Sequence, residues 1–355
     1  MVMTSRPPGQ DFLSVVGRIA DIGKERHTAH ILEHAWQNKP KIRQSLASLG
    51  RAMGAKANSC IVISAGPSVH RKSSIRRILD SGYSGTVVAV DGAYVACLRN
   101  GLVPDYVVTL DPHATRVVRW FGDPDFEENS RHDDYFQRQD LDVEFRKNSI
   151  EQNRQNIELV NRHGSRTRAL VSTTAPGNVV QRIEEAGFDA YWWNPLVDDP
   201  RQPGSLTRQL YEINRLPCIN TGGNVGGAAW VLASAHLKIP NIALTGMDFG
   251  YYADTPRQMT QTYHELVNHA GTAEGLERFF CDFTFPLTGE QCYTDPTYYW
   301  YRKNFLQLLE RSPGWTVNCT EGGTLYGDHV ECLYLEDFIR RVAEPAGSSR
   351  QTVHG

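Results

Sequence analysis

The stretch Cys60-Ile-Val-Ile-Ser-Ala-Gly-Pro-Ser68 joins a short, continuously apolar run to a Gly-Pro turn, and it decides how the chain is expected to fold. Two similar runs follow, Thr86-Val-Val-Ala-Val90 before Asp-Gly and Tyr106-Val-Val-Thr-Leu110 before Asp-Pro. Runs of this kind are typical of strands that are covered on both faces, as in parallel sheets. The more polar segments 69–81 and 93–100 lie between them and predict crossover helices. The sequence therefore predicts an α/β fold, with a Rossmann-like parallel sheet and helices on both faces.

The remaining segments extend this core at both ends and interrupt it once. Apolar spacing of three to four residues predicts a helical lead-in, so 1–55 is expected to be a helical N-terminal segment before a core over 56–342. Residues 113–168 are rich in charged and amide side chains; they predict a helical insertion, with a solvated surface excursion as the alternative. Residues 343–355 are expected to form a polar tail. Further elements are expected as strands at 169–172, 218–219, 241–245 and 316–319, and as a helix of small residues at 228–237.

Composition limits the class of protein. The 355 residues carry a formal net charge of −3, which favours neither nucleic acid nor an anionic membrane as partner. Seven cysteines without a close C-x-x-C pair favour reduced thiols over a disulfide framework or a zinc site. We find no apolar signal segment and no stretch long enough to span a bilayer. The sequence thus predicts a cytoplasmic protein without a membrane span.

The turn after the first run is a candidate phosphate site. In open α/β sheets, ligands bind beyond the carboxyl ends of the strands. Gly66 allows backbone N–H groups to approach a phosphate, Pro67 shapes the turn, and Ser64 and Ser68 add hydroxyl groups. The turn is neither a G-x-G-x-x-G motif nor a P-loop. A tight strand-to-helix turn without a ligand remains the alternative.

Acidic residues follow the next two runs. Asp91 is placed to accept hydrogen bonds from ribose hydroxyls, or else to cap the next helix. Asp111 and His113 are close enough in sequence to act as base and acid, or as a metal pair. The alternative for these two residues is a turn Asp before Pro112 with an exposed imidazole.

Two later segments complete the set of candidate residues. Asn220–Gly227 holds four glycines, and Gly222, Gly223 and Asn224 suit close backbone approach to a ligand, with a flexible loop as the alternative. Asp248 follows the expected strand at 241–245. Arg302 lies within an aromatic stripe that is by default core packing, but a guanidinium can also clamp a phosphate or carboxylate.

In this order, the motifs SAGPSV, VVAVDGA, GLVPDYVVTLDP, LVSTTAP, NTGGNVGG and IALTGMDFG, followed by YTD…YR and NCTEGG, resemble the MptE-like superfamily over about residues 40–340. That group contains archaeal 6-hydroxymethyl-dihydropterin diphosphokinases and bacterial motility accessory factors, which are similar to sialyltransferases. The resemblance adds Thr173 and Glu321 to the residues expected to bind the donor. The strand end Thr-Leu-Asp-Pro and the lack of an H-A-H-G-D-N segment depart from the diphosphokinases, whereas YTD…YR and NCTEGG favour the motility factors.

The resemblance implies a transferase that moves a nonulosonic acid from a CMP-activated donor to a glycan or a flagellin-type protein. Asp111 or Asp248, with His113, would then provide the acid–base chemistry, and no metal or other certain cofactor is expected. The alternative is diphosphate transfer from ATP to a pterin-like alcohol, with Mg²⁺ held by Asp111 and Asp248. A non-catalytic nucleotide-binding module in surface-glycan or flagellar assembly is the third interpretation.

Overall fold

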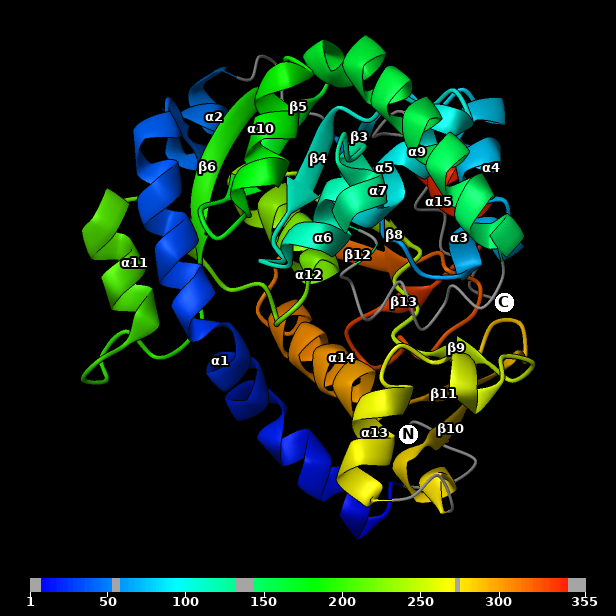
Figure 1. Ribbon diagram of the computed structural model, residues 1–355. Helices are drawn as coiled ribbons and strands as arrows, with labels where there is room; N and C mark the ends of the chain where they lie inside the picture. Colours follow the sequence, from blue (N-terminus) through cyan, green and yellow to red (C-terminus); the bar gives the residue numbers. More distant parts are fainter. Residues whose placement is uncertain (1–7, 53–57, 130, 132–142, 272–274, 344–355) are drawn as a thin grey trace.

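The computed structural model describes residues 8–52, 58–129, 131, 143–271 and 275–343 (Figure 1). Parts of the expected lead-in and insertion, and nearly all of the expected polar tail, lie outside these ranges. Within them, ten strands form one sheet in which every pairing is parallel. In sheet order the strands are β1 (Gln44–Ser45), β6 (Asp189–Pro195), β5 (Arg168–Ser172), β4 (Tyr106–Thr109), β3 (Thr86–Val90), β2 (Ser59–Ile63), β8 (Asn241–Thr245), β12 (Trp315–Asn318) and β13 (Glu331–Cys332), with β7 (Cys218–Ile219) paired to β6.

The strand order reverses at β2. From this strand the chain moves outward through β3, β4, β5 and β6, and it later returns to place β8 on the other side of β2. Ligands of open α/β sheets bind at such a reversal, beyond the carboxyl ends of the strands. The turns that follow β2, β3, β4 and β8 are therefore the candidate positions for a ligand site.

Two apolar layers cover the sheet, one on each face. Along β4, Tyr106 and Val108 point into one cluster and Val107 points into the other, as the alternation of a strand requires. Helix α12 (Val225–Val231) packs against β2, β3 and β4, and its side chains belong to the first cluster. The second cluster contains side chains of α5 (Asp91–Arg99) and α10 (Gly177–Glu185). The expected α/β fold with helices on both faces is confirmed.

The N-terminal lead-in is helical, as expected. Helix α1 (Gln10–Asn38) runs along the outside of the molecule and contacts α11 (Leu206–Asn214) and α14 (Pro296–Leu309) (Figure 1). Helix α2 (Leu46–Ala52) follows, but the short strand β1 comes between them and extends the sheet beside β6, which the helical pattern did not predict.

The insertion is helical as well. It contains α6 (Ala114–Val117), α7 (Phe126–Asn129) and the long α9 (Val143–His163). The crossover expected at 69–81 is broken, because Ser73 has a φ of 50° and separates α3 (Ser68–Arg71) from α4 (Ser74–Asp80). Helix α15 (Leu335–Ala343) ends the described chain.

Besides the two-residue strands β1 and β13, two larger features of the fold were not predicted. Strand β6 contains Trp192 and Trp193, and we did not assign a strand there. A second, antiparallel sheet of three strands is formed by β10 (Cys281–Thr284), β11 (Gln291–Thr294) and β9 (Tyr251–Tyr252). Helix α13 (Tyr263–Ala270) lies beside this sheet (Figure 1).

Candidate functional site

The parallel sheet places nearly all of the expected site residues at one edge. Each of these residues follows the carboxyl end of a parallel strand, and Arg302 on α14 is the exception. By strand they are Ser64, Gly66, Pro67 and Ser68 after β2, Asp91 after β3, Asp111 and His113 after β4, Thr173 after β5, Gly222, Gly223 and Asn224 after β7, Asp248 after β8, and Glu321 after β12. Their partners divide these residues into a structural group and a group able to contact a ligand.

The turn after β2 is bound to the turn after β8. The Gly66 N–H donates to the Gly246 carbonyl at 2.8 Å, and Ser68 Oγ donates to Asp248 Oδ2 at 2.8 Å. A Cβ built on Gly66 would lie 2.1 Å from Asp248 Oδ2. The space beside Gly66 is thus occupied by the protein itself. This corrects the expectation that Gly66 leaves room for a phosphate, and it favours the alternative of a tight turn.

Asp248 is a buried carboxyl that joins three elements. Besides Ser68, it accepts a longer hydrogen bond from the Tyr252 hydroxyl at 3.5 Å through Oδ1. Burial raises the pKa of Asp248 to about 6, and the Ser68 hydrogen bonds offset part of that increase. Because both of its oxygens have partners within the protein, Asp248 holds the turn in place and is a weaker candidate than Asp111 for contact with a substrate.

Four buried side-chain oxygens follow one another along the strand order β4, β3, β2 and β8. They are Thr109 Oγ1, Asp91 Oδ2, Ser64 Oγ and Thr245 Oγ1, and none has a hydrogen-bond partner within the described part of the chain. A buried polar atom without a partner costs about 1–3 kcal/mol, so such atoms are rare in folded proteins. Four such atoms on adjacent strand ends, at the reversal of the sheet, make this edge the candidate position for a polar ligand.

Asp91 is the only carboxyl of that row and is 1% exposed. Its Oδ1 accepts the Gly92 N–H at 2.8 Å. Burial raises the pKa of Asp91 to about 7, and the negative charge of Asp111 adds to the increase. Thr109 lies near enough to offset part of it, although its hydroxyl and Asp91 Oδ2 do not meet hydrogen-bonding geometry. Asp91 can therefore hold or release a proton near neutral pH.

An ion pair lies at the more exposed end of this row. Arg116 on α6 donates to Asp111 Oδ2, and each side chain is 29% exposed. Asp111 Oδ1 accepts the His113 N–H at 2.9 Å, which is the turn geometry expected of an Asp before Pro. Both charges act on Asp91 and also on Tyr301 of α14, whose pKa burial raises to about 12. These four side chains therefore form one electrostatic cluster, here called the strand-end cluster.

The glycine-rich loop after β7 is shaped by protein contacts. A Cβ on Gly223 would lie 2.2 Å from the Trp300 ring of α14, and one on Gly222 would lie 3.2 Å from Leu308. Asn224 caps α12 by accepting the Gly227 N–H at 2.8 Å. Gly222 and Gly223 thus allow the loop to pack against α14, and Asn224 begins α12. Within α12, Gly226 lies close to Ser64, because a Cβ built on Gly226 would be 2.9 Å from Ser64 Oγ. The start of α12 thus lies against one oxygen of the row, Ser64 Oγ.

Three further candidate residues are engaged in structural contacts. Arg302 is buried and donates to the Thr324 and Tyr326 carbonyls at 2.6 and 2.7 Å, so this guanidinium fixes a loop. Glu321 accepts from Arg77 at 2.6 Å and from a backbone N–H at the start of α15. Thr173 is buried and bonded to Asn194 and α1. The two hydrogen bonds of Arg302 favour core packing for this residue, as the aromatic stripe alone suggested.

Sequence reasoning missed several residues near the site. Thr109 and Thr245 end their strands, and Arg116 follows Asp111 by five residues. The two threonines could have been identified from the sequence, because each is a polar residue at the end of an apolar run. No pattern in the sequence indicated the Asp111–Arg116 ion pair. Helix α6 has only four residues, and so short a helix has no apolar periodicity from which the direction of the Arg116 side chain could be predicted.

The Mg²⁺ arrangement of the diphosphokinase alternative does not fit the geometry. Asp111 and Asp248 follow β4 and β8, which are three inter-strand steps apart, or about 14 Å at about 4.8 Å for each step. Oxygen ligands of one Mg²⁺ lie about 2.1 Å from the ion. Among the residues that the structure describes, no three His, Cys, Asp or Glu side chains are grouped in a way that could hold a metal ion. The two carboxylates do not form the shared site that this alternative requires.

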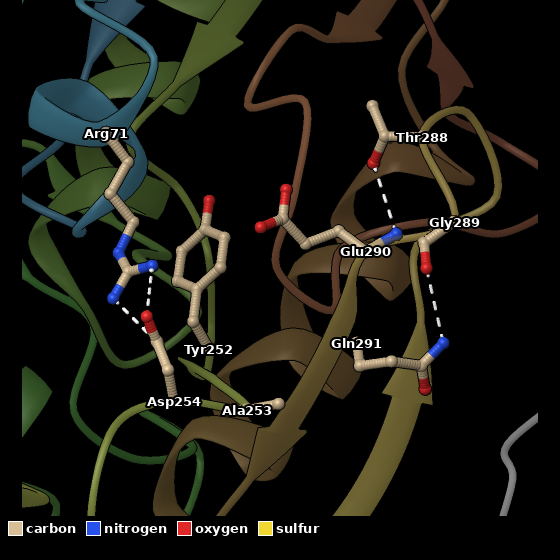
Figure 2. A pocket seen from close by; sticks show the side chains of 8 residues that line it. All are labelled: Arg71, Tyr252, Ala253, Asp254, Thr288, Gly289, Glu290 and Gln291. Carbon is tan, nitrogen blue, oxygen red and sulfur yellow. Dashed lines mark hydrogen bonds and ion pairs between the residues drawn. The ribbon is translucent and has the colours of Figure 1, made fainter.

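A separate cavity of about 380 Å³ lies between α3 and the small antiparallel sheet (Figure 2). Its wall includes Arg71, Tyr252, Asp254 and Glu290. Tyr252 also contacts Asp248, so one residue joins this cavity to the turn after β2. In the part of the chain that the structure describes, no helix combines the length and the apolar character needed to cross a bilayer.

The fold defines the class: an α/β protein whose parallel sheet reverses its strand order at β2 and carries helices on both faces. Residues 33–125, which include β2, β3, β4 and Asp111, match the family model described as 6-hydroxymethylpterin diphosphokinase MptE-like. The MptE-like resemblance is thereby confirmed for this segment.

A solved structure gives a second comparison. The fold is similar to that of the MAf glycosyltransferase from Magnetospirillum magneticum AMB-1, with a TM-score of 0.52 and 14% sequence identity. The match covers 88% of this chain and 40% of that one, so the present chain spans about two fifths of that protein's length. At this identity the likeness shows the fold. No curated protein matched the sequence.

Proposed function

We propose that the protein is a transferase that moves a sugar from a nucleotide-activated donor to an acceptor hydroxyl, with the donor bound at the strand-end cluster. The observation that carries this proposal is the row of partnerless buried oxygens that ends at the Asp111–Arg116 pair. The MptE-like segment contains β2, β3 and β4, and the similar fold is that of a protein described as a glycosyltransferase. The family model is described as a diphosphokinase and the similar structure as a glycosyltransferase, so what both support is group transfer.

Asp91 and its neighbours suit the nucleoside part of the donor. A ribose hydroxyl both donates and accepts, so it can satisfy Asp91 Oδ2 and an adjacent threonine or serine hydroxyl together. An acid after the second strand of a Rossmann-like core serves this purpose in dinucleotide folds. Within the proposal the donor is CMP-linked and the transferred group is a nonulosonic acid, as the motility-factor motifs imply. The acceptor is a glycan or a protein.

The Asp111–Arg116 pair suits the reacting end of the donor. In the transfer, the acceptor oxygen forms a bond to the anomeric carbon while the bond from that carbon to the phosphate oxygen breaks. The positive charge of the Arg116 guanidinium beside Asp111 stabilises the negative charge of the leaving phosphate. The Asp111 carboxylate, half-exposed beside it, accepts the proton that the acceptor hydroxyl loses. Holding both substrates in this geometry supplies the rest of the rate enhancement.

Nucleotide release tests the proposal. Purified protein is incubated with CMP-, UDP- and GDP-activated sugars, and the free nucleotide is measured for the wild type, Asp111→Asn and Asp80→Asn. Asp80 is a matched control, because it is an exposed aspartate that also pairs with an arginine, Arg76, but it is the last residue of α4 and does not follow a strand. We expect release from a CMP-linked donor, a loss of about 10²-fold or more in Asp111→Asn, and no change in Asp80→Asn.

Two results would contradict the proposal. If the activated sugar binds but no free nucleotide is formed from it, the protein is the non-catalytic nucleotide-binding module. Release that depends strictly on ATP and Mg²⁺ with a pterin alcohol would restore the diphosphokinase interpretation.

A further inference from the structure

The cavity between α3 and the antiparallel sheet has a wall of hydrogen-bonding side chains. Figure 2 shows Arg71 on one side and Glu290 on the other, with Tyr252 between them. Thr288 and Gln291 complete the polar wall. The cavity has a volume of about 380 Å³ and opens to solvent, since the Arg71 and Asp254 side chains are 39% and 67% exposed.

The charges of this cavity are already paired. Arg71 donates two hydrogen bonds to Asp254, at 3.0 and 2.7 Å, and lowers the pKa of that carboxyl. Lys72 donates to Glu290 at 2.5 Å. The Arg71 guanidinium also lies over the Tyr252 ring, 4.3 Å from the centre of that ring. The carboxylates of Asp254 and Glu290 share this wall, and their negative charges would repel a phosphate, so the cavity disfavours an anionic ligand.

Paired charges of this kind still leave many hydrogen-bonding positions. Each carboxylate has about four lone-pair sites and the guanidinium has five N–H donors, of which the ion pairs use only some. A sugar hydroxyl can accept from a guanidinium and donate to a carboxylate at the same time. The wall therefore fits a neutral ligand that is rich in hydroxyl groups.

The cavity is connected to the donor edge by a short chain of contacts. The Tyr252 hydroxyl donates to Asp248, and Asp248 accepts from Ser68 in the turn after β2. Arg71 belongs to α3, which begins at Ser68. A ligand in the cavity is thus next to the turn at the reversal of the sheet.

We propose that this cavity, lined by Arg71, Asp254 and Glu290, is a binding subsite for a neutral saccharide unit of the acceptor. The identification of the saccharide as an acceptor rests on the transferase function proposed above. The bound unit positions an acceptor whose reactive hydroxyl extends toward the strand-end cluster, where the glycosidic bond forms. The cavity itself takes no part in breaking or forming bonds.

Saccharide binding is measured without any donor, by saturation-transfer NMR with lactose and maltotriose, and with inorganic phosphate followed by ³¹P line broadening as the anionic probe. The variants are Asp254→Asn and Glu290→Gln, with Asp80→Asn as the control and circular dichroism to verify folding. We expect a saccharide signal for the wild type and Asp80→Asn, reduced about tenfold in either cavity variant, as loss of a charged hydrogen bond predicts. Equal signals in all four proteins, no signal from either saccharide, or binding of phosphate alone at this cavity would overturn the proposal.

A second readout separates this proposal from the transferase function. In the release assay without acceptor, the cavity variants should release nucleotide at the wild-type rate, whereas with saccharide acceptor their KM for the acceptor should rise about tenfold. If no donor is hydrolysed but the saccharide still binds in the cavity, the proposed transferase function is contradicted, while the proposed saccharide site is supported.

Discussion

Replacing Asp91 by Asn should stabilise the folded protein at neutral pH. Asn keeps the shape of the side chain, and its Oδ1 can still accept the Gly92 N–H. The substitution removes the negative charge and replaces Oδ2 by an NH2 group. Burial makes that charge unfavourable and raises the pKa of Asp91 from 3.8 to about 7. Because the folded state favours the protonated acid, its stabilising contribution is complete below about pH 3.8 and is lost as the pH rises through about 7.

The size of the effect follows from that pKa difference. About 3 pH units at about 1.4 kcal/mol each give about 4 kcal/mol in favour of Asn at pH 8. At pH 4 the wild-type carboxyl is protonated in the fold and half-protonated when unfolded, so the advantage falls below about 1 kcal/mol.

Denaturant unfolding of the wild type, Asp91→Asn and Asp80→Asn at pH 4, 6 and 8 measures this difference. The gain should increase with pH for Asp91→Asn and stay near zero for Asp80→Asn, whose carboxyl is exposed. A variant that is less stable than the wild type at pH 8, or a gain that does not depend on pH, would refute the reasoning. A side chain that lowers stability at the pH where the protein works is typical of a functional site.

Three further substitutions separate structural from chemical roles. Gly66→Ala should lower the free energy of unfolding by about 1–3 kcal/mol, because its Cβ overlaps Asp248; unchanged denaturant midpoints would contradict this contact. Arg302→Lys should destabilise the fold by about 1–3 kcal/mol through loss of a two-carbonyl contact, with the KM for donor unchanged; a raised donor KM would return Arg302 to the site. Asp111→Asn should leave the free energy of unfolding within about 1 kcal/mol of wild type while it lowers the rate of transfer about 10²-fold or more, since Asp111 is partly exposed beside Arg116; a destabilised but active variant would remove it from the mechanism.

The core of the fold was predictable because its strands are strongly patterned. The runs ending at Ser64, Val90 and Leu110 are β-branched, continuously apolar and followed by Gly, Pro or Asp, and all three became adjacent parallel strands. Strand β6 was missed because Trp192, Trp193 and Asn194 do not distinguish a buried strand from a helix by periodicity. The antiparallel sheet was missed because β9 has two residues and its partners come from a distant part of the chain.

The sequence predicts where the candidate residues lie on the sheet but not which contacts they make. Sheet topology brings the strand ends to one edge, so Asp91 and Asp111 could be identified from their place after an apolar run. The sequence cannot show which neighbours a side chain will meet. Gly66 lies against Asp248, and Arg302 lies against backbone carbonyls, only because segments about 180 and 22 residues apart pack together.

The central claim, that the strand-end cluster binds the nucleotide of the donor, is tested most directly by thermal shift with CMP, UDP, GDP and ATP. A nucleotide at about a hundred times its dissociation constant should stabilise the wild type by about 2.7 kcal/mol. We predict such a shift for CMP with the wild type and Asp80→Asn, and an affinity about tenfold lower for Asp91→Asn, which loses a charged acceptor. No shift with any nucleotide, or equal shifts in the wild type and Asp91→Asn, would contradict the account.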